Sequence, residues 1–90
     1  VILTWAGSKF DSAGLGALDG SAAVDSHVEI KPVNSKSQTP AFVKASGEQN
    51  AFAPAVLQQG AEGLKYEAKL KAGQTAGDFK AAATFNMTYN

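Results

Sequence analysis

The C-terminal residues of this chain alternate between apolar and polar side chains, and this pattern constrains the fold more than any other feature. The residues between the apolar ones are polar, with the exception of Ala82. A period of two places the two sets on opposite faces of an extended strand, whereas a helix would scatter both sets around its circumference. The pattern therefore predicts a β-strand from residue 79 to the end of the chain. Its apolar face comprises Phe79, Ala81, Ala83, Phe85, Met87 and Tyr89.

Three further segments have the composition or alternation of strands. Residues 64–71 alternate without interruption, with lysine and glutamate on the outer face. Residues 24–33 predict a half-buried strand that ends, or lies at a sheet edge, at Pro32. Residues 1–7 are rich in strand-forming residues and place Trp5 on one face with other apolar side chains. The expected core residues from these strands are Trp5, Val28, Ile30, Leu64, Tyr66 and Leu70.

The connecting segments give weaker predictions. Residues 8–23 predict an irregular connection with brief extended pieces, and residues 34–40 predict a turn. Residues 41–44 suggest a short strand. For residues 51–59 a helical turn and extended chain both stay open, because Pro54 excludes only a long helix. The expected loop anchors are Leu15, Leu18, Phe52, Val56 and Leu57.

Length and charge exclude several classes of function. Ninety residues suffice for one domain at most. The formal net charge is zero, so no basic surface for nucleic-acid binding is expected. No apolar run approaches the length of a membrane span. The chain has no cysteine and one histidine, His27, which is expected to be solvated on the polar face of its strand. No catalytic motif, metal site or cofactor site is predicted, and an enzyme is not expected.

The terminal segment also carries a resemblance to a known family. Residues 76–90 read AGDFKAAATFNMTYN, with a glycine at Gly77, alternating apolar residues and a penultimate Tyr89. This segment resembles the closing strand of chaperone–usher pilins, the subunits of bacterial fimbriae. The glycine turn, the alternating strand of residues 64–71 and the short loop before the final strand resemble the same family in the same order. Residues 24–33 resemble the family's mid-domain strand, less specifically. Residues 3–7 are weakly similar to a strand that lies just after the family's second cysteine.

The resemblance implies an all-β, immunoglobulin-like β-sandwich that lacks its final strand and is completed by donor-strand complementation. In this family a disulfide ties the first strands together, and this chain has no counterpart to that region. Residues 1–90 are therefore expected to form the C-terminal portion of a single pilin domain without its N-terminal strands. The groove beside the final strand would accept the donor. The expected groove residues are Gly77, Phe79, Ala81, Ala83, Phe85, Met87, Tyr89 and Asn90.

By this resemblance the chain is expected to be a structural fimbrial subunit that polymerises by donor-strand exchange and supports adhesion. The implied partners are neighbouring subunits, a periplasmic chaperone and an outer-membrane usher. The implied location is a fimbrium on the surface of a Gram-negative bacterium. The alternative is a carbohydrate-binding domain, either of a pilus-tip adhesin or of a free β-sandwich. The structural role is favoured because the aromatic residues fall mostly in predicted strands rather than in loops.

Overall fold

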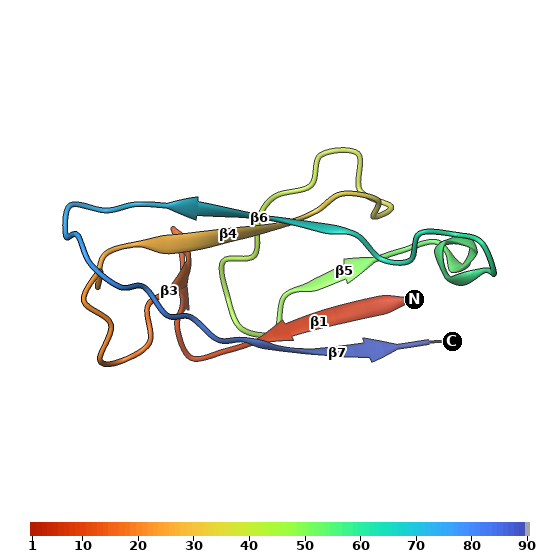
Figure 1. Ribbon diagram of the computed structural model, residues 1–90. Helices are drawn as coiled ribbons and strands as arrows, with labels where there is room; N and C mark the ends of the chain where they lie inside the picture. Colours follow the sequence, from red (N-terminus) through yellow and green to blue (C-terminus); the bar gives the residue numbers. More distant parts are fainter. Residues whose placement is uncertain (90) are drawn as a thin grey trace.

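The central strand β1 (Ile2–Ala6) organises the first of two antiparallel sheets. The computed structural model describes residues 1–89, and in it β1 pairs with β5 (Gln49–Ala51) on one side and with β7 (Thr84–Thr88) on the other. The strand order is β5-β1-β7, and the start of β1 and the end of β7 lie at the same end of this sheet (Figure 1). The predicted inward face of the first segment is confirmed, since Val1 and Leu3 are buried and Trp5 is half-buried.

The second sheet is built around β4 (His27–Pro32) and β6 (Tyr66–Lys71). The short strands β2 (Phe10–Asp11) and β3 (Gly14–Gly16) complete the strand order β2-β3-β4-β6. The pairing of β4 with β6 runs from His27 opposite Lys71 to Pro32 opposite Tyr66. β4 ends at Pro32, as the sequence predicts, and Pro32 has no strand partner on the side away from β6.

Aromatic side chains join the two sheets. One buried cluster contains Leu3 and the fully buried Phe52, and the other contains Leu15, Ile30 and Val43. Trp5 from the first sheet and Tyr66 from the second pack against both clusters. The interior is therefore one layer of apolar side chains between two sheets, consistent with an immunoglobulin-like β-sandwich.

Most of the predicted strands form, but two differ from expectation. Residues 41–44 form no strand; Val43 is nevertheless buried, and its N–H donates to the carbonyl of Ile30 at 2.9 Å. The final strand is shorter than predicted, because residues 79–83 are outside β7. The open question at residues 51–59 is settled by the short 3-10 helix η1 (Pro54–Leu57).

The two strongly alternating segments lie in different sheets. β6 is an edge strand of one sheet and β7 is an edge strand of the other, although they follow each other along the chain. This arrangement leaves an unpaired strand edge on each side of the interior. No helix within residues 1–89 has the length and apolar character needed to cross a membrane.

Candidate functional site: an open groove beside the terminal strand

Within residues 1–89, the terminal strand β7 has a backbone partner on one side only. It pairs with β1 from Ala6 opposite Thr84 to Ile2 opposite Thr88, and it ends the sheet. Half of its backbone N–H and C=O groups therefore point away from β1, toward the open side of the sandwich. Such an edge is the usual place for another extended segment to add to a sheet.

An apolar groove lies next to this edge, between the two sheets. Its volume is about 370 Å³. Its walls come from β1, β7, β6 and the segments that lead into β6. We call this the main groove, and it is lined by Leu3, Trp5, Leu57, Leu64, Tyr66, Phe85 and Met87.

The large apolar side chains at the end of the terminal segment are exposed rather than buried. Phe85 is 62% exposed, Met87 46% and Tyr89 67%. Phe85 contacts Trp5, with ring centroids 5.7 Å apart, so the aromatic layer of the interior continues to the surface at this strand. A row of exposed large apolar side chains next to an unpaired strand edge indicates an interaction surface.

A second, smaller pocket continues the surface toward the start of β7. It has a volume of about 280 Å³ and its lining consists of small residues. Ala83 reaches both this pocket and the second core cluster. The surface along the strand is thus lined by large side chains at Phe85 and Met87 and by a small side chain at Ala83. The small pocket is lined by Ala6, Gly7, Ser8, Ala82, Ala83 and Thr84.

The segment before β7 is held by a loop instead of a strand. Lys80 accepts a hydrogen bond at its carbonyl from the N–H of Leu18, and it exchanges two bonds with the hydroxyl of Ser21. Gly77 has a φ of +134°, and a Cβ built on it would lie 2.5 Å from the Cβ of Ala22. The predicted strand therefore begins late because loop 18–23 takes the hydrogen bonds of residues 78–80.

The structure divides the eight groove residues expected from the sequence into three groups. Ala83, Phe85 and Met87 line the two pockets. Gly77, Phe79, Ala81 and Tyr89 lie on the same segment outside both linings, Phe79 half-buried and Ala81 and Tyr89 exposed. Asn90 lies outside the described residues.

The expected core residues differ in how far they are covered. Ile30 is buried, whereas Trp5, Val28, Leu64 and Tyr66 are half-buried at the edges of the two clusters. The expectation that Leu70 belongs to the core is wrong for this chain, because Leu70 is 60% exposed. It lies opposite Val28, which packs against the second cluster, but its own side chain is open to solvent.

The lone histidine is not simply solvated. Its Nε2 lies 2.9 Å from a carboxylate oxygen of Asp11, and its side chain is largely buried. The hydrogen bond with His27 is the main reason why the pKa of Asp11 lies below its ordinary value. Within residues 1–89 no group of three or more His, Cys, Asp or Glu is placed to hold a metal ion. The contact between His27 and Asp11 joins β4 to β2.

Comparison with known proteins gives one informative relative. Over 87 residues, or 97% of its length, the chain is 40% identical to the F107 fimbrial protein of Escherichia coli. The chain is a relative of a fimbrial protein. The resemblance of the terminal segment to fimbrial subunits is thereby confirmed. The chain spans about half of the length of this relative, since the match covers 48% of it. No family model matches the chain, and no solved structure matches it.

Proposed function

We propose that this chain forms part of a structural subunit of a chaperone–usher fimbria, in which the edge of β7 accepts an extended segment from a neighbouring subunit. The observation that carries this proposal is the coincidence of an unpaired strand edge with an apolar groove along the same strand. The relationship to the F107 fimbrial protein supports the fimbrial part of the proposal. We also propose that residues 1–90 are the C-terminal portion of one pilin domain.

The chemistry of the groove fits an apolar peptide better than a sugar. Among its lining side chains only Trp5 and Tyr66 carry polar atoms. The hydroxyl of Tyr66 already donates to the side-chain oxygen of Asn50 at 2.8 Å. A carbohydrate site needs several convergent polar groups, whereas alternate apolar side chains of an added strand need only apolar pockets. The groove therefore favours the structural subunit over the carbohydrate-binding alternative.

Two exposed strand edges support the view that further strands complete the domain. β7 and β6 are both unpaired on one side, and both contribute residues to the main groove. The exposure of Leu70, which lies opposite the core-packed Val28, also fits a domain whose cover over β6 is incomplete in residues 1–89. Under the proposal that residues 1–90 are the C-terminal portion of one domain, we infer that a further segment of that domain covers β6 and that a donated segment occupies the edge of β7.

During assembly the proposed partners are a periplasmic chaperone, an outer-membrane usher and other subunits of the fimbrium. The experiment that tests this uses co-expression of the chain with a pilin chaperone in a bacterial periplasm, followed by affinity capture. Phe85→Glu places a charge in the main groove, so we expect it to abolish capture. Asn86→Glu is the matched control, because Asn86 lies on the opposite face of β7 and its exchange should leave capture intact.

Two outcomes would contradict the proposal. One is equal capture of the Phe85→Glu and Asn86→Glu variants, which would mean that the groove does not bind the chaperone. The other is a chain that binds no added extended segment along β7. That result would show that the edge of β7 does not accept a donated strand.

A further inference from the structure

Leu64 is a wall residue of the main groove, but it does not belong to a strand. β6 begins two residues later, at Tyr66. The last backbone bond that joins the β4 side to this segment runs from the N–H of Val33 to the carbonyl of Lys65, at 2.9 Å. Beyond that point the backbone ladder between the two strands stops, so another group must fix the position of Leu64.

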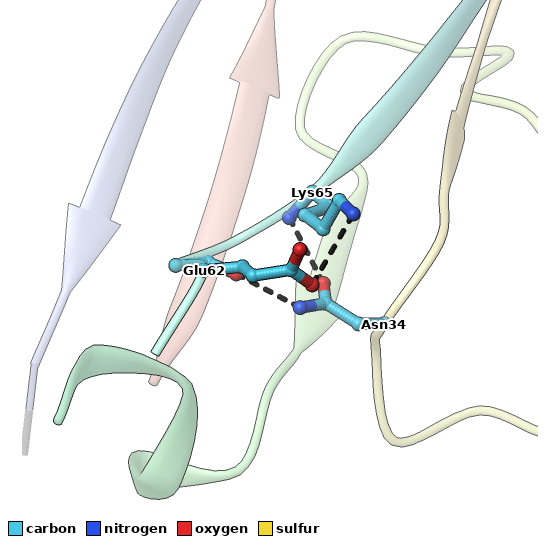
Figure 2. Close-up of polar contacts among 4 residues, drawn as sticks. Asn34, Glu62 and Lys65 are labelled. Carbon is cyan, nitrogen blue, oxygen red and sulfur yellow. Dashed lines mark hydrogen bonds and ion pairs between the residues drawn. The ribbon is translucent and has the colours of Figure 1, made fainter. Parts of the chain in front are cut away.

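The side chain of Asn34 continues the ladder on both sides of Leu64. Its Nδ2 donates to the carbonyl of Gly63 at 2.8 Å, and its Oδ1 accepts from the N–H of Lys65 at 2.9 Å. Figure 2 shows the amide of Asn34 directed at this segment, with both bonds drawn. One side-chain amide thus binds the two backbone groups that flank Leu64, as a neighbouring strand would do.

The hydrogen bonds around Gly63 also reach a second wall of the groove. The N–H of Gly63 donates to the carbonyl of Val56 in η1, at 3.0 Å, and η1 also carries the groove residue Leu57. Gly63 is therefore bound at its N–H by the 3-10 helix and at its carbonyl by Asn34. This links the turn after β4 to both apolar side chains at this end of the groove.

We propose that Asn34 is a positioning residue for the main groove, which sets the place of Leu64 against an incoming extended segment. The inference rests on the proposed function, since it names a residue that shapes the proposed acceptor site. The nearby ion pair between Lys65 and Glu62 does not have this role. Its atoms are 3.3 Å apart and both side chains are largely exposed, so its removal should change little.

The test measures the affinity of the 90-residue chain for a synthetic peptide in which valine alternates with threonine over the length of β7. Asn34→Ala leaves two backbone groups beside Leu64 without partners, and we expect about tenfold weaker binding. Glu62→Gln, which removes only the ion pair, should change affinity less than about twofold. Circular dichroism reports whether each variant is folded.

A double-mutant cycle separates positioning from general stability. If Asn34 acts through Leu64, the effect of Asn34→Ala should fall to within about twofold when Leu64→Ala is already present. An undiminished effect in that background would overturn the inference, because the two hydrogen bonds of Asn34 would then contribute only to the stability of the fold. Should Asn34→Ala fail to fold, Asn34→Asp replaces it in the cycle, since it keeps the acceptor for the N–H of Lys65.

A second probe distinguishes failure of the inference from failure of the proposed function. The dye 8-anilinonaphthalene-1-sulfonate binds apolar grooves without strand pairing. If the wild-type chain binds the dye but not the peptide, the donated-strand proposal fails, and the cycle is then measured with the dye. Loss of dye affinity on Asn34→Ala that disappears with Leu64→Ala would support the positioning role; an unchanged affinity would overturn it.

Discussion

Trp5 packs edge-on against Tyr66, with ring centroids 5.4 Å apart and ring planes at 85°. The two residues belong to different sheets, and both line the main groove. An edge-to-face pair adds stability beyond the apolar area that it buries. The same contact therefore holds the sandwich together and forms the floor on which an added strand would lie.

The first prediction concerns Tyr66 at alkaline pH. Burial raises the pKa of its hydroxyl above the ordinary value of 10.0. Because folding favours the neutral hydroxyl, its burial contributes to the free energy of unfolding. This contribution is complete below pH 10.0 and is lost as the pH rises through the raised pKa. Tyr66→Phe should remove this loss. Urea unfolding of both proteins between pH 9 and 11.5 checks this, and equal pH slopes would contradict it.

The second prediction concerns the glycine before the terminal strand. Gly77→Ala combines a φ of +134° with a Cβ only 2.5 Å from that of Ala22. Gly60→Ala is the control, because Gly60 has a φ of +88° and open space around it. The control should lose about 1–2 kcal/mol of unfolding free energy. Gly77→Ala should lose at least about 1 kcal/mol more, since loop 18–23 must move. Equal losses in urea unfolding would show that the contact with Ala22 is not constraining.

The third prediction concerns the charges across β4 and β6. Glu29 lies directly opposite Lys69, and Lys31 lies opposite Glu67. Glu29→Lys puts like charges opposite each other and should cost about 0.5 kcal/mol. Adding Lys69→Glu restores an opposite-charge pair and should recover most of that loss. Urea unfolding of the three variants at low salt checks this, and an additive second loss would refute a pairwise interaction.

The fourth prediction concerns the carboxylate of Asp25, which holds the loop between β6 and β7. It accepts from the N–H groups of Gln74 at 2.7 Å and Thr75 at 3.1 Å. The bond from Gln74 is the main reason why the pKa of Asp25 lies below its ordinary value of 3.8. A lowered pKa means that the stabilising effect of these hydrogen bonds is present above pH 3.8 and is lost as the pH falls through the lowered pKa.

NMR titration tests these hydrogen bonds to Asp25 directly. The amide proton shifts of Gln74 and Thr75 should change together, with a midpoint below pH 3.8. In Asp25→Ala this change should be absent. Ser26→Ala is the control, because it removes only the bond between the N–H of Gly73 and the Ser26 hydroxyl. A titration that persists in Asp25→Ala would assign the shift change to another group.

Local patterns predicted the positions of the longer strands well. The alternation of residues 64–71 predicted β6, and the position of Pro32 predicted the end of β4. The same patterns failed where cover depends on distant segments. Leu70 follows the alternation yet is exposed. Residues 79–83 also alternate, but loop 18–23 takes the hydrogen bonds of residues 78–80.

Polar contacts between distant residues could not be predicted at all. Asn34 occurs in a run of turn residues, and nothing local indicates that its amide binds Gly63 and Lys65. His27 has the sequence context of a solvated residue, but the path of β2 brings Asp11 to it. Such contacts depend on where the backbone goes after several turns, and the residue types involved are equally common at free surfaces.

The sequence by itself determined that this chain is all-β, which residues of each strand share a face, and that its terminal segment is like that of a fimbrial subunit. Only the tertiary structure decided that β7 lies at a sheet edge, that β6 lies in the other sheet, and that an apolar groove opens between them. The physical reason is that alternation is a property of neighbouring residues. Pairing and cover depend on which distant segments compete for the same backbone groups and the same apolar surface.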